Sequence, residues 1–407
     1  MRYTFKFILL LTAAFLFHGN STEARSSFDK NHFSFHGMAE EPGLRVMIGQ
    51  MLMVGYGPGT EVPETLQTDI ADRGLGGVIL LAYNVDGPQS LSRLTSDLQR
   101  EAEVPLFISI DQEGGRIARL NEQNGFSSTY TPEELGEMDS EWTTRDQANK
   151  MAGWLRDGGV NINLAPVVDV NVNPDSPAIG SLDRSFSDDP YTVSDHARWF
   201  IDEFHQKEVI TALKHFPGHG SAEEDSHYDF TDITETWKEK ELVPYQELIK
   251  QGYSGMIMPG HLYHAEFDSD YPATLSEKTL TGKLREEMGF DGVIISDGMF
   301  MRAIQDHYGF FESVKLAINA GIDILLYTGN YYEDESLVRQ IVDYVEQQVT
   351  LNIYDIQGRK IRQLANGTHG SGVHSYDFRA DGLSSGVYLY RLETGGRRIT
   401  RKMMLLQ

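Results

Sequence analysis

The sequence of 407 residues contains no cysteine. This excludes disulfide bonds, thiolate metal sites, a cysteine nucleophile and a lipid anchor on an N-terminal cysteine. Positive charge is also scarce, because 35 Lys and Arg oppose 60 Asp and Glu, which leaves a net charge of -25. Since such a chain repels phosphate, the composition argues against a nucleic-acid partner.

The apolar run near the N-terminus is too short to span a bilayer, which takes about 20 apolar residues in a helix. The run covers residues 7–17, follows a basic start and precedes small polar residues at 21–24. This order is typical of a secretory signal. We therefore predict a signal peptide over residues 1–25, a polar linker over 26–43 and no transmembrane span in the mature chain. An uncleaved anchor is the alternative.

Short apolar runs recur along residues 44–349, and a segment long enough for a helix follows each of them. The runs are residues 49–54, 77–81, 106–110, 162–168, 209–213, 255–258, 292–295 and 323–327. Apolar strands that alternate with helices indicate a parallel sheet, and eight repeats favour an α/β fold closed into a (β/α)8 TIM barrel. An open doubly wound sheet is the alternative, although no G-x-G-x-x-G motif opens a helix here.

The composition changes from residue 350 onward. Four short alternating segments are expected to be strands, at residues 351–354, 374–378, 386–392 and 398–406. Clusters of Gly, Asn and Ser at residues 365–367 and 383–386 are expected to separate them. Residues 350–407 are therefore predicted to be a small all-β, sandwich-like module for addressing or docking. A cap on the barrel is the alternative reading.

Charged and polar side chains follow the predicted strands at one end of the sheet. Asp111, Asp169, Lys214, His261 and Asp297 each come at or just after the end of an apolar run. Because catalytic residues of such barrels gather at the C-terminal ends of the strands, this pattern predicts an active site there.

Asp297 and the loop at residues 225–227 are the candidates for the chemistry. A carboxylate in the position of Asp297 can be a nucleophile, a base or a metal ligand, and the alternative is a cap on the next helix. Asp225 lies two residues before His227 and can hydrogen-bond its imidazole, which makes a tunable general acid and base. An ordinary polar loop is the alternative.

A metal site built from His215, His219 and His227 is a further reading of the same loop. The spacing of the first two residues suits ligands on a helix. Pro217 and Gly218 stand between them and break any helix, so we predict no metal and no cofactor.

Several charged side chains suit a ligand that carries many hydroxyl groups. They are Asp111, Arg119, Arg184, Lys214 and His215. Charge-assisted hydrogen bonds to neutral polar groups contribute about 1.5 to 3 kcal/mol each. The basic members would suit phosphate equally, but the nearby carboxylates would repel it, so a sugar is the better match.

Five motifs in this order closely resemble glycoside hydrolase family 3. They are I-D-Q-E-G-G-R at residues 110–116, D-R-S-F at 183–186, K-H-F-P-G-H-G at 214–220, D-S-H at 225–227 and I-S-D at 295–297. The likeness extends from about residue 46 to residue 346 and is greatest to the β-N-acetylhexosaminidase branch, which includes the bacterial N-acetylglucosaminidases. It implies a (β/α)8 barrel.

The resemblance also implies roles for the candidate residues. Asp297 would be the nucleophile, and His227 with Asp225 would be the acid/base pair that replaces a second carboxylate. The terminal sugar would be held by Asp111, Arg119, Arg184, Lys214 and His215. The implied enzyme is an exported, retaining exo-β-N-acetylglucosaminidase acting on peptidoglycan fragments or chitooligosaccharides. A β-glucosidase, a phosphorylase of the same family and a catalytically dead sugar-binding barrel are the alternatives.

The tail has a resemblance of its own. Residues 351–359 and 383–392 are similar to the sorting domain of type IX secretion, although the N-P strand that usually opens such domains is absent. This likeness implies secretion machinery as a partner and delivery to the cell surface or the medium. The periplasm is the alternative.

Overall fold

The computed structural model describes residues 4–10, 44–226, 230–328, 337–355, 357–368, 373–379, 383, 386–394 and 397–405. Contacts divide the chain into two compact units. The first is Gly49–Ile341, and the second consists of Met1–Ile48 together with Val342–Gln407.

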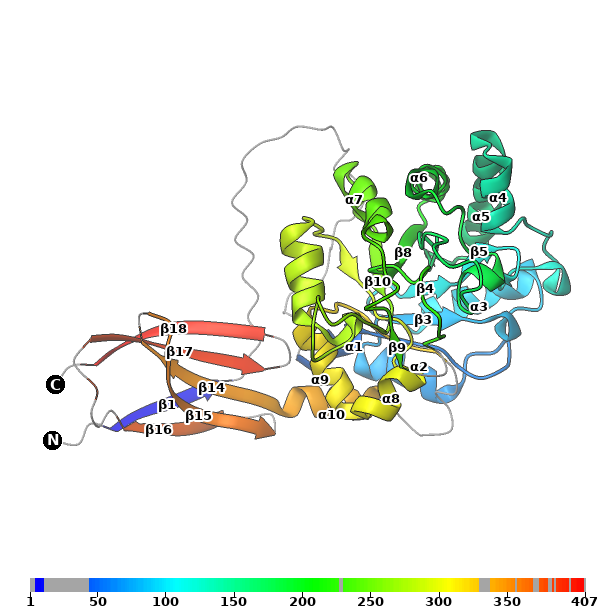
Figure 1. Ribbon diagram of the computed structural model, residues 1–407. Helices are drawn as coiled ribbons and strands as arrows, with labels where there is room; N and C mark the ends of the chain where they lie inside the picture. The colour runs from blue at the N-terminus through cyan, green and yellow to red at the C-terminus, as the bar shows by residue number, and fades with distance from the viewer. Residues whose placement is uncertain are drawn as a thin grey trace, which may run out of the picture. The chain divides into compact units, whose positions relative to one another are not determined.

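A curled sheet of eight parallel strands forms the centre of the first unit (Figure 1). The strands are β2 (Leu52–Val54), β3 (Gly77–Leu80), β4 (Phe107–Ile110), β7 (Ile162–Asn163), β8 (Ile210–Phe216), β10 (Met256–Pro259), β12 (Val293–Ile294) and β13 (Leu325–Tyr327). Their order is β12-β10-β8-β7-β4-β3-β2-β13. Each strand overlaps one of the eight predicted apolar runs, so the α/β class and the parallel sheet are confirmed.

The end strands of this order are linked to each other. Ile295 and Ile324 form a parallel bridge, and the backbone amide of Ser296 donates to the carbonyl of Ile324 over 2.8 Å. Apolar side chains from strands throughout the sheet share one inner core. Its buried members are Met53, Ile79, Ile162, Leu164, Ala212, Met256, Met258, Ile295, Ile324 and Leu326.

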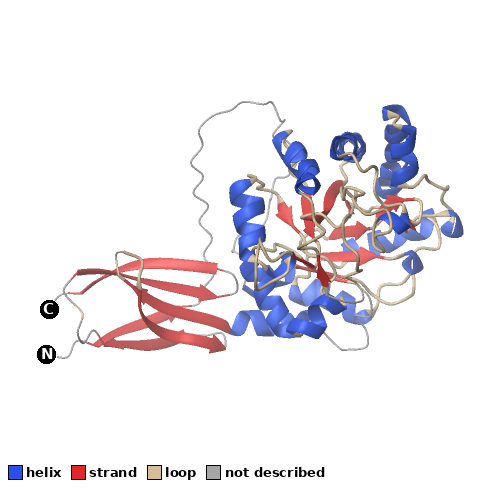
Figure 2. Ribbon diagram, in the orientation of Figure 1, coloured by secondary structure: helices blue, strands red, loops and turns tan. Residues whose placement is uncertain are grey.

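Helices cover the outer side of the sheet, as Figure 2 shows in blue around the red strands. Those in predicted segments are α2 (Glu64–Arg73), α3 (Pro88–Arg100), α5 (Glu141–Asp157), α6 (Pro190–Gln206), α7 (Val243–Lys250), the π-helix η6 (Lys278–Glu287) and α9 (Phe310–Ala320). Capping explains why several begin where they do. Ser140 caps α5, and Asp189 caps α6 directly before a proline at its first position.

The chain contains further helices and strands, of which η4 and α10 lie where helical segments are expected and the others were not predicted from the sequence. The helices are α1 (Leu44–Gln50), α4 (Pro132–Met138), α8 (Arg302–Tyr308) and α10 (Leu337–Gln347). The shorter pieces are η1 (Ala82–Asn84), η2 (Glu122–Asn124), η3 (Gly180–Leu182), η4 (Glu239–Leu242), η5 (Ala273–Leu275), β5 (Gln112–Gly114), β6 (Ile117–Ala118), β9 (Thr231–Asp232) and β11 (Leu262–Tyr263). None of the helices in the described ranges is both long and apolar enough to cross a membrane.

The second unit contains an antiparallel sheet of order β15-β14-β17-β18. Its strands are β14 (Gln348–Tyr354), β15 (Lys360–Thr368), β17 (Gly386–Thr394) and β18 (Arg397–Leu405). The expected break at residues 365–367 is wrong, because these residues lie within β15 and pair with β14. A register shift after Leu351 accommodates them.

A separate two-stranded ladder joins β1 (Thr4–Leu10) to β16 (Val373–Arg379), and both belong to the second unit. β1 lies within the predicted signal peptide. Strand pairing does not report whether a leader is removed, so cleavage stays a prediction. The predicted linker at residues 26–43 lies outside the described residues.

Substitution by alanine should have opposite effects on stability at two glycines that lie in helices. A Cβ on Gly136 of α4 would lie 1.6 Å from the carbonyl oxygen of Phe186, whereas a Cβ on Gly153 of α5 would meet nothing within 4 Å. Gly136→Ala should therefore destabilise the chain by about 1 to 3 kcal/mol through overpacking. Gly153→Ala should stabilise it by up to about 1 kcal/mol, since alanine is the better helix former. Chemical denaturation of both variants checks this, and equal effects would contradict the close approach of α4 to Phe186.

Candidate active site

The five residues predicted to hold a sugar come from four segments at the same end of the sheet. Asp111 directly follows β4, Arg119 follows β6 and Arg184 lies two residues after η3. Lys214 and His215 are part of β8, which continues to Phe216 and not only to residue 213 as expected. The strand thus holds these two side chains directly.

Lys214 lies between two carboxylates in the interior. Its Nζ is 2.8 Å from Oδ1 of Asp111 and 2.7 Å from Oε1 of Glu113. Glu113 also accepts two hydrogen bonds from Arg184, at 2.8 Å from Nη2 and 2.9 Å from Nε. This fork is the strongest geometry for an arginine and a carboxylate. The side chain of Lys214 is only 3% exposed, so these contacts replace the hydrogen bonds that its ammonium group would otherwise make with water.

Asp111 and Arg119 form the more open side of this cluster. Nη2 of Arg119 lies 3.3 Å from Oδ2 of Asp111, and the two side chains are 29% and 16% exposed. They therefore remain accessible to a ligand. The side chain of Glu113 is only 1% exposed and contacts Lys214 and Arg184 from the interior.

Four groups at the centre of the cluster are ionised at neutral pH, namely the two carboxylates of Asp111 and Glu113 and the two cations of Lys214 and Arg184. Burial alone would raise the pKa of Asp111 and of Glu113, but the charge of Lys214 acts on both, together with Arg119 and Arg184 respectively, and holds each pKa below its usual range. Burial alone would lower the pKa of Lys214 and of Arg184, but the neighbouring carboxylates outweigh it and raise both.

Asp169 orients the imidazole of His215. Its Oδ2 lies 2.7 Å from Nδ1 of His215, and its Oδ1 accepts the backbone amides of His215 and His219 at 3.0 and 2.8 Å. Burial would raise the pKa of Asp169, but the charge of His215 and these hydrogen bonds hold it below its usual value. Nε2 of His215 is left toward Arg184, whose Nη2 lies 3.5 Å away.

The loop after β8 is anchored before it reaches the predicted acid/base pair. Burial lowers the pKa of His219 to about 4, so this side chain is neutral, and its Nε2 lies 3.4 Å from Oγ of Ser226. Asn173 donates its backbone amide to the carbonyl of Gly220. Asp225 is half-buried next to Ser226, and His227 lies outside the described residues.

Asp297 follows β12 at the same end of the sheet and is half-buried. Its Oδ1 accepts the backbone amide of Gly298 over 2.7 Å, and the carbonyl of Gly298 lies 3.0 Å from Nε2 of His261. The alternative that Asp297 caps the next helix is wrong, because α8 begins at Arg302 and its N-cap residue is Met301.

Three residues of the cluster received no role from the sequence. Glu113 lies inside the motif at residues 110–116, and Asp169 directly follows the fourth apolar run, so both had a visible signal. His219 had been considered only as a metal ligand. Within the described ranges, which exclude His227, no three His, Asp or Glu side chains are placed to hold a metal ion.

A parallel α/β sheet that gathers charged residues at the C-terminal ends of its strands defines a class of barrel-like enzymes. The chain belongs to glycoside hydrolase family 3, because residues 43–362 match the glycosyl hydrolase family 3 N-terminal domain. Residues 339–406 match the secretion system C-terminal sorting domain, which indicates export. Both resemblances noted in the sequence are confirmed.

The chain is similar to several bacterial hexosaminidases. It is 36% identical over 294 residues to β-hexosaminidase A of Pseudoalteromonas piscicida, across 66% of this chain and 48% of that protein. It is 39% identical over 267 residues to a β-hexosaminidase of Tolumonas auensis, across 63% and 76% of the two chains.

Solved structures agree with these relatives. The β-N-acetylglucosaminidase of Paenibacillus sp. FPU-7 aligns with a TM-score of 0.70 at 32% identity, across 75% of this chain and 59% of the other. NagZ of Neisseria gonorrhoeae aligns with a TM-score of 0.64 at 27% identity, across 72% and 84%. The chain thus spans about half of the Pseudoalteromonas protein and more than half of the Paenibacillus structure.

Removal of the buried charge on Glu113 should destabilise the chain. Glu113→Gln leaves Arg184 and Lys214 with less compensation in the interior, which should cost about 3 to 5 kcal/mol. The measurement is the free energy of unfolding in urea. Asp195→Asn is the matched control, because it breaks a surface ion pair with Arg198 and should change stability by less than about 0.5 kcal/mol. Equal effects of the two variants would contradict the buried network.

Glu241 of η4 lies behind the loop after β8 and is fully buried. Its Oε1 accepts the backbone amide of Lys238 over 3.1 Å, and a Cβ on Gly218 would lie 2.6 Å from the Cβ of Glu241. The neighbouring Trp237 donates its indole N–H to the carbonyl of Pro217 over 3.1 Å. Burial raises the pKa of Glu241 to about 7, and the nearby Ser221 opposes only part of this rise.

The raised pKa of Glu241 predicts a dependence of stability on pH. The folded chain keeps the proton up to about pH 7, whereas the unfolded chain loses it near the ordinary value of 4.5. Stability should therefore fall as the pH rises between these values, by on the order of 3 kcal/mol in total. Glu241→Gln should lack this fall, so its stability relative to the parent should increase from pH 5 to pH 7. Urea titrations of both chains at several pH values check this, and parallel curves would contradict it.

Proposed function

We propose that the protein is an exported, retaining exo-β-N-acetylglucosaminidase that releases terminal N-acetylglucosamine from peptidoglycan fragments or chitooligosaccharides. The observation that carries the proposal is the cluster of Asp111, Lys214, Arg184 and His215, joined through Glu113 and Asp169 in a chain of this family. Because the charges of the cluster are paired with one another, a neutral ligand need not supply a counter-charge, and the open side offers it oriented donors and acceptors.

In this proposal the terminal sugar binds at the more open side of the cluster. The carboxylate of Asp111 accepts from sugar hydroxyls, and Lys214 and Arg119 donate to them. His215 contributes its Nε2, because Asp169 occupies Nδ1. Arg184 contacts the sugar while Glu113 holds its guanidinium in place.

The first chemical step forms a glycosyl-enzyme. An oxygen of Asp297 attacks C1 of the sugar, and the bond from C1 to the leaving oxygen breaks. His227 gives its proton to that oxygen, and Asp225 stabilises the imidazolium that supplies it. The role of His227 rests on the D-S-H motif, since that residue lies outside the described part of the chain.

The second step releases the sugar. The imidazole of His227, now neutral, takes a proton from water, whose oxygen attacks C1 as the bond to Asp297 breaks. Two displacements at C1 return the original configuration, so the product is the β-anomer. Phosphate in place of water would give a sugar phosphate by the same route.

The curled sheet in this proposal is a closed (β/α)8 barrel. The bridge between Ile295 and Ile324 supports closure, since it joins the two end strands of the sheet order. The C-terminal module directs the chain through type IX secretion to the cell surface or the medium, and the match of residues 339–406 to a sorting domain supports this role.

Asp297→Asn should abolish the activity, because the amide cannot form the covalent intermediate. The expected fall in kcat for a nitrophenyl N-acetylglucosaminide is at least about 1000-fold. Asp291→Asn is the matched control, since Asp291 is an exposed carboxylate before β12 and should leave kcat unchanged. An active Asp297→Asn variant would contradict the assignment.

The same assay, run with the nitrophenyl glucoside and with added phosphate, separates the proposed activity from a glucosidase and a phosphorylase. Faster turnover of the glucoside or formation of a sugar 1-phosphate would favour one of those alternatives.

A further inference from the structure

A second place on the first unit has the chemistry of a carbohydrate site and lies apart from the proposed catalytic residues. It is a hollow of about 310 Å³ between α3, α5 and the segment after η2. The residues that line it are Pro88, Gln89, Ser92, Gly125, Phe126, Ser127, Trp154, Asp157 and Gly158. We refer to it as the Trp154 groove.

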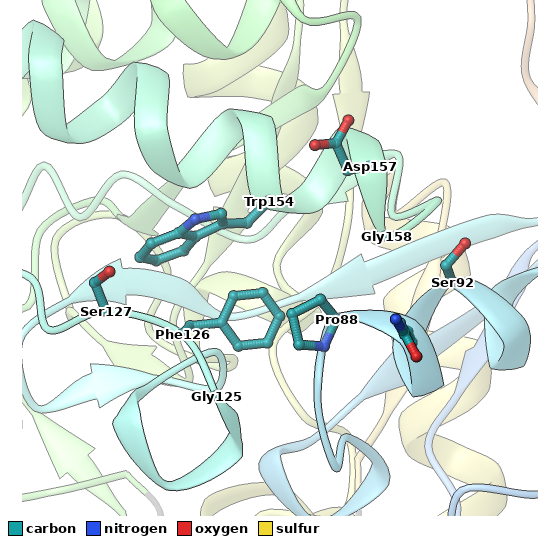
Figure 3. Close-up of a pocket in the computed structure, with 9 residues that line it drawn as sticks. Pro88, Ser92, Gly125, Phe126, Ser127, Trp154, Asp157 and Gly158 are labelled. Carbon is teal, nitrogen blue, oxygen red and sulfur yellow. The ribbon is translucent and has the colours of Figure 1, made fainter.

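Two aromatic rings form the apolar part of the Trp154 groove. Figure 3 shows the indole of Trp154, which projects from α5, lying over the ring of Phe126 with Pro88 beside it. The ring centres of Trp154 and Phe126 are 5.4 Å apart and the planes are inclined at 59°. Lys150, one turn earlier on α5, also contacts the indole, with its Nζ 5.4 Å from the ring centre. The indole is therefore held in place while part of it remains exposed to the groove.

Polar groups surround these rings. Gln89 and Asp157 are exposed, and Ser92 and Ser127 add two hydroxyls. Among the described residues that line the groove, Asp157 is the one with a charge, and Lys150 beside the indole carries the opposite charge, so the two together do not favour a charged ligand of either sign. Apolar faces next to a few oriented polar groups suit a neutral sugar ring, whose C–H face packs on an aromatic ring while its hydroxyls reach the edge.

The Trp154 groove adjoins a second hollow. That second hollow, of about 320 Å³, is also lined by Ser127, and further by Gly115, Arg116 and Ala118. In the sequence, Gly115, Arg116 and Ala118 lie between Glu113 and Arg119, which belong to the charged cluster. A shared wall thus makes the two hollows neighbours along one side of the unit.

We propose that the Trp154 groove binds an N-acetylglucosamine unit of a polymeric glycan, at a point other than the one where the terminal sugar is cleaved. This inference rests on the proposed function, because that function supplies the β-linked glycan. The groove would hold the enzyme on a long or insoluble chain and would not contribute to turnover of a small substrate.

The test compares the full chain with Trp154→Ala in two assays. One measures kcat and KM for the nitrophenyl N-acetylglucosaminide, and the other measures binding to insoluble chitin by sedimentation. Trp154→Ala should leave the first assay unchanged within about twofold and weaken chitin binding about tenfold. Trp142→Ala is the matched control, because Trp142 lies on the same helix, is 74% exposed and does not line the groove. It should leave both assays unchanged.

A second pair of variants keeps the test independent of the stability of Trp154→Ala. Ser92→Tyr fills the groove from α3 and should weaken chitin binding in the same way, whereas Ser96→Tyr, one turn further along α3, should not. Chitin binding that survives both Trp154→Ala and Ser92→Tyr would overturn the inference, as would an equal loss in the two control variants.

The outcomes separate this inference from the proposed function. Turnover of the nitrophenyl substrate with chitin binding that does not depend on Trp154 would reject the groove and retain the enzyme assignment. Chitin binding that depends on Trp154 in a parent chain without turnover would do the reverse.

Discussion

The rest of the site depends on one interaction, the pairing of the buried ammonium group of Lys214 with the carboxylates of Asp111 and Glu113. Burial of a single positive charge at this depth would be prohibitive, and the carboxylates of Asp111 and Glu113 offset it. Glu113 also offsets the buried charge of Arg184, which is bound to it on its other side. Since the contacts connect β8 with the segment after β4 and with the segment after η3, they also fix where these backbones lie. The charged cluster is therefore a structural constraint as well as the proposed binding surface.

The site consists of residues on strand β8 and of the loop after this strand, whose first residues are held by hydrogen bonds. β8 carries Lys214 and His215, and Asp169 positions the imidazole and the next loop with one carboxylate. Glu241 and Trp237 pack behind the same loop at Gly218 and Pro217. Beyond Ser226 the loop leads to His227, so in the proposed function the groups on β8 hold the sugar while the proton donor comes from a separate segment.

Much of the fold could be predicted from the sequence because strands of a parallel sheet are buried on both faces and are apolar throughout. That signal located all eight strands. Short helices such as α4 and α8 carry too few turns to show a period, and β15 mixes Lys360, Arg362 and Gln363 with Asn366 and Gly367, so its strand character comes only from pairing with β14. Tertiary contacts decide such segments.

The site could be predicted in part for a similar reason. The residues proposed to bind the sugar belong to motifs that can be read locally, but Glu113 and Arg184 are 71 residues apart and Asp169 and His215 are 46 apart. Contacts between residues so far apart along the sequence form only in the folded chain. Glu241 carried no local signal at all, because its raised pKa comes mainly from burial.

The most direct measurement of the central claim is the position of a bound terminal sugar. A crystal structure of the Asp297→Asn chain with chitobiose should place the terminal N-acetylglucosamine within hydrogen-bond distance of Asp111 and Lys214, with C1 facing residue 297. A terminal sugar that binds away from the Lys214 cluster, or with C1 turned from residue 297, would contradict the account.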